Sequence, residues 1–288
     1  VYKRQVLSLT SCDSFLDIQP VGKVIPNTLE EYRALITTAY GVDLTDRGMC
    51  DMRTEDISVS KDEFDQNNFK DIERWVTSNP SGTEFGWSYY YQNIYYANAI
   101  INKKNEITEG SEAEINQLVG EAYFMRGYMH FLLVNLYGQP YTKEGAPTSK
   151  AIPLKLSLDL EEMPTRNTVE EIYASILSDI ENARQLINHK EWETGYNYRF
   201  SKLAVDAFES RVRLYKGEWQ AAYNAAERVL EQKSTLEDYN NNNSTDFQMP
   251  NTYTSVESIT AYENVYSRNG INACLLYTSP SPRDRTRS

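Results

Sequence analysis

Apolar residues recur at helical spacing along most of the chain, and the longest such stripe lies between residues 111 and 137. Its members follow one another at steps of three or four residues, which keeps them on one face of a helix; they are Leu118, Ala122, Met125, Met129, Leu132 and Leu136. Ser111 and Glu114 form a capping box at its start, and Gly138 follows its end. The pattern predicts one long helix that buries one face.

Two more capping boxes predict further helices. Thr28 and Glu31 open the first, whose apolar residues are Tyr32, Leu35, Ile36 and Tyr40. Thr168 and Glu171 open the second, whose stripe consists of Val169, Ile172, Ile176, Ile180, Ala183 and Ile187. Between these helices, residues 86–106 predict another, with Tyr91, Ile94, Asn98 and Ile101 on one face.

Residues 201–232 contain the pattern of a helix pair. Gly217 separates two helical segments, and small residues at Ala222, Ala225 and Ala226 allow the second helix to approach the first closely. This arrangement is typical of the tetratricopeptide repeat, of about 34 residues per unit, although no strict array of that period is present. We therefore predict an all-α fold of irregular tetratricopeptide-like helix pairs, with long loops at residues 42–85, 138–166 and 233–254.

Composition excludes several classes of function. A net charge of −12 argues against a nucleic-acid partner, because neutralising phosphates needs basic residues. No run of about 18 apolar residues predicts a membrane-spanning helix. The sequence has two His and three Cys, with no glycine-rich phosphate loop and no G-x-S-x-G elbow. These observations predict no catalytic residue, no metal site and no cofactor.

The two ends of the chain resemble translated sequencing adapter. Residues 1–5 (Val-Tyr-Lys-Arg-Gln) match one strand of a transposase adapter, and residues 274–284 match the other strand. We expect residues 1–5 and 274–288 to be adapter scars that take no part in the fold.

Residues 6–12 resemble the end of a lipoprotein signal peptide. Leu-Thr-Ser-Cys at positions 9–12 places an apolar residue three positions before Cys12 and small residues directly before it. This is the pattern of a lipobox, in which the cysteine is acylated and becomes the first residue of the mature protein. The alternative is an ordinary cysteine at the end of a core segment.

The order of landmarks along the chain resembles the SusD/RagB family of outer-membrane lipoproteins. These landmarks are Cys12–Asp17 with Pro20, Thr28–Tyr32, Trp87–Ile101, Gly120–Pro140, Ile152–Leu154, Pro164–Ala183, Arg199–Ala222 and Glu257–Ile259. The resemblance implies that residues 13–273 form the N-terminal, helical-repeat half of a SusD-like protein. It also implies a lipid-anchored protein on the extracellular side of the outer membrane in Bacteroidetes, which binds a glycan or another oligomeric nutrient. Its partner would be a SusC-like TonB-dependent transporter, and no bond would be broken.

The aromatic residues suggest where a sugar could bind, because flat side chains stack on the apolar faces of sugar rings. Trp75 in the long loop 42–85 is the candidate, with Asn67, Asn68 and Arg74 around it for hydroxyl groups. The tyrosines on the predicted helices are expected in the core instead; they are Tyr91, Tyr95, Tyr128, Tyr173 and Tyr223.

Several other polar residues are expected to have structural roles. Glu121 and Arg126 are candidates for an ion pair within or between helices, His130 for a packed or half-exposed helix residue, and His189 for a surface residue. Two rival functions remain. A tetratricopeptide adaptor would bind only proteins, whereas an all-α glycan-cleaving enzyme would need two carboxylates about 5–10 Å apart in a cleft.

Overall fold

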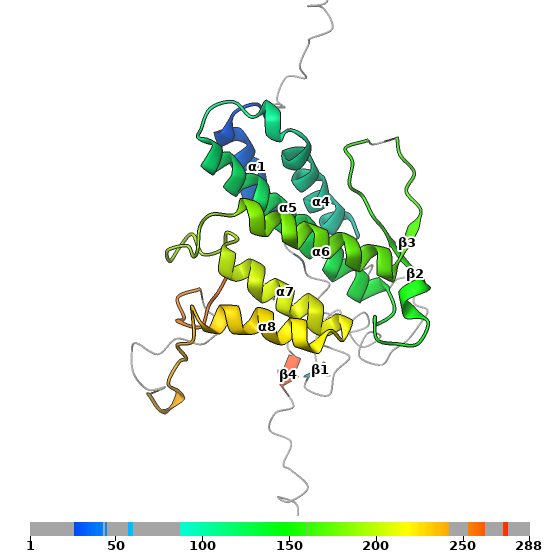
Figure 1. Ribbon diagram of the computed structural model, residues 1–288, viewed down its shortest axis with the longest axis vertical. Helices are drawn as coiled ribbons and strands as arrows, with labels where there is room; N and C mark the ends of the chain where they lie inside the picture. Colours follow the sequence, from blue (N-terminus) through cyan, green and yellow to red (C-terminus); the bar gives the residue numbers. More distant parts are fainter. Residues whose placement is uncertain are drawn as a thin grey trace, which may run out of the picture.

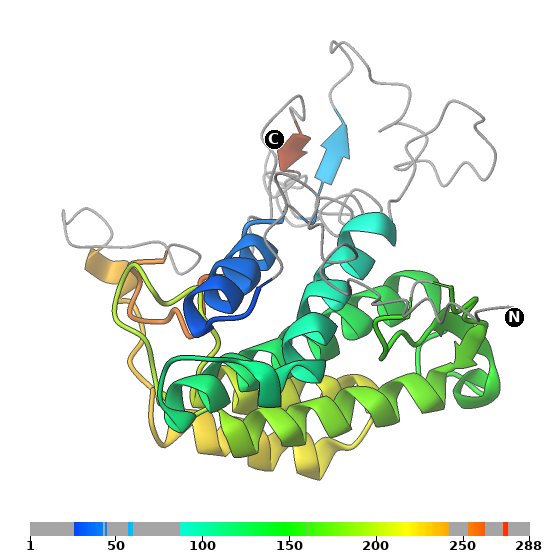
Figure 2. The same ribbon diagram turned by 90° about the horizontal axis from the view of Figure 1, so that it is seen from above.

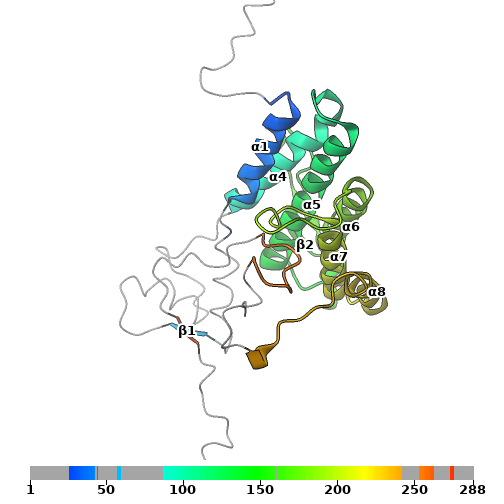
Figure 3. The same cartoon turned by 90° about the vertical axis from the view of Figure 1, so that its left-hand side faces the viewer.

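A computed structural model describes residues 26–42, 44, 57–59, 87–159, 161–241, 253–262 and 273–275. Six α-helices dominate this part of the chain and lie side by side in sequence order (Figures 1 and 3). They are α1 (Leu29–Tyr40), α4 (Trp87–Asn102), α5 (Glu112–Tyr137), α6 (Val169–Leu186), α7 (Lys202–Lys216) and α8 (Trp219–Leu230). The predicted all-α fold is confirmed. None of the described helices combines the length and apolarity that a bilayer crossing requires.

Short elements connect the helices. The single-turn helices are η2 (Lys104–Glu106), η3 (Ala146–Thr148) and η4 (Tyr239–Asn241). Strands β2 (Lys150–Pro153) and β3 (Arg166–Thr168) pair antiparallel. Strand β2 lies within the connection 138–166 that the sequence predicted as a loop, and β3 begins at its last residue. The Tyr91 hydroxyl donates a hydrogen bond of 2.8 Å to the Pro153 carbonyl, so α4 anchors this strand pair.

A second antiparallel pair joins β1 (Ile57–Val59) and β4 (Ala273–Leu275). Cys274 lies opposite Ser58, and Leu275 lies opposite Ile57. The expectation that residues 274–288 take no part in the fold is therefore wrong for these two residues, because strand pairing uses backbone groups that every sequence carries. Residues 1–25, with Cys12, and residues 276–288 lie outside the described residues.

All three predicted capping boxes are present. In each, the side chain of the capping residue accepts a hydrogen bond from the backbone of the glutamate, which in turn accepts one from the capping backbone. Thr28 begins α1, Ser111 begins α5 and Thr168 begins α6. The donated backbone hydrogen bonds lower the pKa of Glu31, because they stabilise its charged form.

Helix α5 forms the centre of the fold. Helices α1 and α4 contact it on one side, whereas α6 and α7 contact it on the other (Figure 2). Every residue from Gln117 to Val134 except Tyr123 is consequently buried. The sequence predicted burial of one face only, and that expectation is wrong because the polar residues Gln117, Glu121, Arg126 and His130 are buried as well.

Close helix contacts depend on small residues at particular positions. A side chain at Gly120 would place its Cβ 2.8 Å from the Ile187 backbone nitrogen, so only glycine lets α5 lie this close to the end of α6. Gly217 has a φ of 78° and ends α7, as predicted. Ala222 and Ala225 are buried where α8 packs on α7, which confirms the predicted helix pair.

His130 is fully buried in α5. Within the described part of the chain, neither of its ring nitrogens has a hydrogen-bond partner. Burial lowers the pKa of His130 to about 3, with a smaller contribution from the nearby charge of Arg126. The imidazole is therefore neutral at pH 7, and protonating it in the fold is unfavourable.

The pH dependence of stability tests this assignment. In the unfolded chain the pKa of a histidine lies at about 6.5, so below this pH the unfolded state binds a proton that the folded state does not. This residue then reduces the free energy of unfolding by about 1.4 kcal/mol for each pH unit, until the pH approaches the folded pKa. We expect His130→Leu to remove this component between about pH 6 and pH 4 in urea-unfolding experiments. Met129→Leu is the control for apolar repacking, and identical slopes for wild type and His130→Leu would contradict the assignment.

Candidate functional site

The ligand residues predicted from the sequence lie outside the described residues. This holds for Trp75, Asn67, Asn68 and Arg74, which all belong to the loop 42–85, and for the lipidation candidate Cys12. Their assignment stays a prediction.

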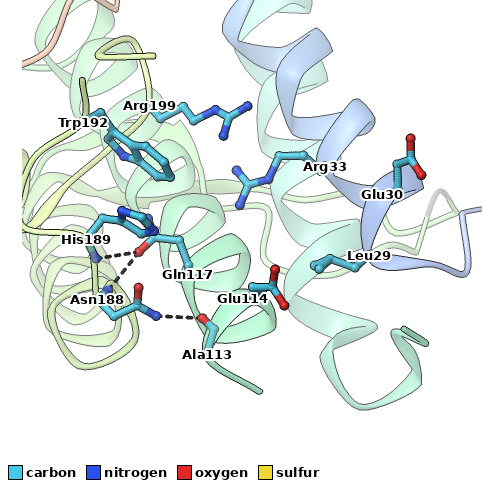
Figure 4. Close-up of a pocket in the computed structure, with 10 residues that line it drawn as sticks. All are labelled: Leu29, Glu30, Arg33, Ala113, Glu114, Gln117, Asn188, His189, Trp192 and Arg199. Carbon is cyan, nitrogen blue, oxygen red and sulfur yellow. Dashed lines mark hydrogen bonds between the residues drawn. The ribbon is translucent and has the colours of Figure 1, made fainter. Parts of the chain in front are cut away.

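The structure instead contains a pocket between the start of α1, the start of α5 and the segment 188–199 (Figure 4). Its volume is about 400 Å³, within the range of small-ligand sites. The lining residues come from these three elements and are Leu29, Glu30, Arg33, Ala113, Glu114, Gln117, Asn188, His189, Trp192 and Arg199.

Backbone hydrogen bonds hold the first turns of α1 and α5 beside each other. The Leu29 amide donates to the Thr108 carbonyl, and the Thr108 amide donates to the Asn27 carbonyl, both at 2.9 Å. Thr108 lies three residues before Ser111, the capping residue of α5. The capping boxes of Thr28 and Ser111 therefore place the first turns of α1 and α5 next to each other in the wall of the pocket.

The third wall is a stack of side chains around Trp192. The His189 ring lies parallel to the indole, with ring centres 3.9 Å apart and an angle of 11°. The Arg199 guanidinium lies 5.2 Å from the centre of the indole, and the indole nitrogen donates to the Phe200 carbonyl at 3.1 Å. Both His189 and Arg199 thus pack on Trp192 and, with the hydrogen bond to Phe200, hold the indole in place.

A buried polar cluster lies beneath the pocket, with the Glu121 carboxylate at its centre. Glu121 accepts hydrogen bonds from the Arg33 guanidinium at 2.7 Å, from the Tyr40 hydroxyl at 2.9 Å and from the Gln117 amide at 2.9 Å. Burial, followed by the charge of Glu121, raises the pKa of Tyr40 well above its ordinary value. The hydroxyl therefore stays protonated and donates to the carboxylate.

Gln117 connects this cluster to the segment 188–199. Its side-chain oxygen accepts from the backbone amides of Asn188 and His189, at 2.9 and 3.0 Å, and its amide donates to the Phe200 carbonyl at 3.2 Å. The positions of the Trp192 stack and of α1 therefore depend on the same buried residues of α5.

The expected roles of Glu121 and Arg126 are confirmed in part. Both form ion pairs between helices, but with partners that the sequence did not identify. Glu121 pairs with Arg33 of α1. Arg126 binds both oxygens of Asp179 in α6 and donates to Asn98 of α4 at 2.9 Å.

The tyrosines divide into two groups. Tyr128 and Tyr173 are buried and Tyr91 is half-buried, as predicted. Tyr95 is 42% exposed and Tyr223 is 59% exposed, so the prediction of a core position is wrong for both. Helical spacing alone does not reveal which side of a helix stays exposed.

Trp192 and Arg199 were not identified as site residues from the sequence. The signal available was the density of aromatic residues between positions 189 and 200, in a segment without helical periodicity. His189 is exposed, as predicted, but it also stacks on Trp192 and lines the pocket. In the described part of the chain, no cluster of three or more His, Cys, Asp or Glu residues could hold a metal ion.

Comparison with known proteins gives a consistent set of relatives. A family model, SusD-like_3, described as starch-binding associating with outer membrane, matches residues 15–214. The SusD-like protein P38 of Formosa agariphila is 27% identical over 230 residues, which are 77% of this chain and 42% of that protein. The SusD-like protein P2 of the same organism is 22% identical, over 81% of this chain and 46% of that protein. The chain therefore spans less than half the length of these curated relatives.

Solved structures show the same fold. A SusD superfamily protein from Bacteroides thetaiotaomicron aligns with a TM-score of 0.65 and 26% identity, over 75% of this chain and 49% of that one. A putative sugar binding protein from Bacteroides vulgatus aligns with a TM-score of 0.67 and 24% identity, over 82% and 53% of the two chains. A laminarin binding SusD-like protein aligns with a TM-score of 0.59 and 20% identity, over 75% and 46%.

Removing the Tyr40 hydroxyl tests the buried cluster. Tyr40→Phe deletes the donor to Glu121 and the acceptor of the Phe200 amide, whose hydrogen bond to the hydroxyl measures 3.1 Å. We expect the free energy of unfolding to fall by about 1–3 kcal/mol, because a buried carboxylate and a buried amide each lose a partner. Urea unfolding measures this effect. Tyr95→Phe, at an exposed tyrosine of α4, is the matched control, and an equal effect of both exchanges would count against the cluster.

Proposed function

Because the chain belongs to the SusD-like family, we propose that it binds a glycan at the cell surface and delivers it to a SusC-like TonB-dependent outer-membrane transporter. The observation that carries this proposal is the family match over residues 15–214, under the description starch-binding associating with outer membrane. The structural neighbours named as sugar binding and laminarin binding support a glycan as the nutrient.

The proposed mechanism is binding and transfer without chemistry on the glycan. The six packed helices act as a rigid scaffold, and loops supply the ligand contacts. Within the described part of the chain, the carboxylates buried between helices are committed to arginines, as Glu121 is to Arg33 and Asp179 to Arg126. They serve packing, which fits a role in binding rather than catalysis.

We propose Trp75 as a ligand-binding residue of the loop 42–85. An indole face covers the apolar C–H face of a sugar ring, and the neighbouring Asn67, Asn68 and Arg74 provide donors and acceptors for its hydroxyl groups. The residue types and their proximity in sequence support this assignment.

We also propose that Cys12 carries a lipid anchor and that the protein faces the extracellular side of the outer membrane. The lipobox-like pattern at residues 9–12 and the association with the outer membrane in the family description support this placement. Trp219 of α8 is 65% exposed and Tyr223 is also exposed, and they offer apolar area for contact with a transporter.

Glycan binding by wild type and a Trp75 variant tests the proposed function. We expect the 288-residue chain to bind at least one class of oligosaccharide on a glycan array. Trp75→Ala should weaken that binding about tenfold or more in calorimetry, since stacking on an aromatic ring contributes to affinity. Trp219→Ala is the matched control, because it removes an exposed tryptophan of α8 and should leave glycan affinity unchanged. Binding to no glycan, together with tight binding of peptides, would favour the adaptor function instead.

Lipidation is tested in a host that processes lipoproteins, on a gene that supplies the upstream part of the signal peptide. We expect labelled fatty acid to be incorporated into the wild-type protein and not into Cys12→Ala. Cys50→Ala is the matched control and should keep the label. Equal labelling of Cys12→Ala and wild type would exclude Cys12 as the anchor.

A further inference from the structure

We propose that the pocket between α1, α5 and residues 188–199 binds the carboxylate group of an acidic sugar. This inference rests on the proposed function, since it assigns a second saccharide site and its chemical class to a glycan-binding protein. The observation that carries it is the convergence of two guanidinium groups, those of Arg33 and Arg199, on one pocket of about 400 Å³.

Arg199 provides a cation that is held in place without an ion pair. Its guanidinium lies 5.2 Å from the ring centre of Trp192, 4.9 Å from that of Tyr196 and 5.6 Å from that of Tyr198. Within the described residues, no carboxylate forms an ion pair with it, and its one side-chain hydrogen bond is with the Tyr198 hydroxyl at 3.4 Å. Aromatic faces attract a cation but leave its in-plane N–H donors available.

Arg33 enters the pocket from the opposite wall. One of its nitrogens donates to the buried Glu121 carboxylate at 2.7 Å, and Figure 4 shows the guanidinium pointing from α1 into the pocket toward the wall formed by Trp192 and Arg199. Glu121 balances the charge of Arg33. The charge of Arg199 therefore remains available to an anionic ligand, and both side chains retain N–H donors for it.

The two acidic residues of the pocket do not supply that match. Figure 4 shows the Glu30 carboxylate directed away from both guanidinium groups, at the outer side of α1. The Glu114 carboxylate accepts hydrogen bonds from the backbone and the hydroxyl of Ser111, at 2.8 and 2.7 Å, as part of the capping box. Neither residue forms an ion pair with Arg199.

The rest of the lining favours a sugar over a bare anion. Leu29 and Ala113 offer apolar contacts for ring C–H groups, and the edge of Trp192 and the ring of His189 lie beside the same space. The volume suits one or two hexose rings. An ionised carboxylate accepts paired N–H bonds from an arginine, an interaction that a neutral hydroxyl cannot replace. These features together favour a sugar that carries a carboxylate, and uronic acids are the simplest members of that class.

Isothermal titration of the 288-residue chain with matched ligands tests the proposal. The probes are the disaccharides of galacturonate, glucuronate and guluronate, each beside its methyl ester, which keeps the rings and removes the charge. We expect at least one uronate to bind about tenfold more tightly than its ester, because charge-assisted hydrogen bonds are lost in the ester. Acetate should also bind about tenfold more weakly, since it lacks the ring contacts. If no uronate exceeds its ester, or if acetate binds as tightly as the uronates, the proposal is overturned.

Variants then assign the binding to this pocket. Arg199→Gln should weaken uronate binding about tenfold or more, and Arg199→Lys should restore it only in part, because lysine lacks the planar paired donors. Arg211→Gln, at an exposed arginine of α7 outside the pocket, makes the same charge change and should leave the affinity unchanged. Unchanged uronate affinity in Arg199→Gln overturns the assignment.

Arg199→Gln could weaken binding by disturbing the packing of Trp192, Tyr196 and Tyr198 around Arg199. A second variant therefore leaves both arginines intact. Glu30→Gln removes a negative charge from the rim and should tighten uronate binding by about two- to fivefold. Weaker binding in this variant would contradict an anion site. The glycan array separates this proposal from the proposed function. If neutral glycans bind and Arg199→Gln does not change their affinity, only the assignment of an acidic sugar to this pocket is rejected. If no glycan binds, the proposed function itself is rejected.

Discussion

Two opposite charges buried in the central helix determine how the rest of the structure can pack. Glu121 and Arg126 of α5 are five residues apart, so their side chains point about 140° apart around the helix axis. Glu121 reaches Arg33 of α1, and Arg126 reaches Asp179 of α6 and Asn98 of α4. An unpaired charge in either position would cost about 3–5 kcal/mol. The helices around α5 can therefore adopt only an arrangement that satisfies both charges.

The same residues connect the core to the pocket. Arg33 pairs with Glu121 and also lines the pocket, while Gln117 donates to Glu121 and holds the backbone of Asn188 and His189. The pocket walls come from segments that lie far apart in the sequence, and each is fixed by a hydrogen bond to one turn of α5. Side chains held by such contacts lose less conformational entropy on binding than free side chains do, which suits the proposed ligand site.

The sequence was sufficient to predict the helices, but it did not identify the partners of the buried charges. Capping boxes and apolar stripes are local, and the stripe of α6 from Val169 to Ile187 is buried throughout, as predicted. Glu121 and Arg126 lie on opposite sides of the apolar stripe of α5, and their partners Arg33 and Asp179 lie 88 and 53 residues away along the chain. Periodicity contains no information about such distant partners. The pocket wall at Trp192 and Arg199 was missed for a related reason, since it lies in a segment without any repeat.

The charged contacts between helices also account for the irregular sequence of the helix pairs. Different sets of charges link three parts of the helix array: Glu121 with Arg33 between α5 and α1, Arg126 with Asp179 between α5 and α6, and a third set from α6 to α8. In that set, Asp206 and Glu209 of α7 each accept from Arg184 of α6 and from Arg228 of α8. A regular tetratricopeptide array repeats one interface, so one consensus recurs at a fixed period. Here the charged partners differ between these parts, so one consensus at a fixed period cannot describe them. The helical repeat is thus retained in the architecture while its sequence signature is lost.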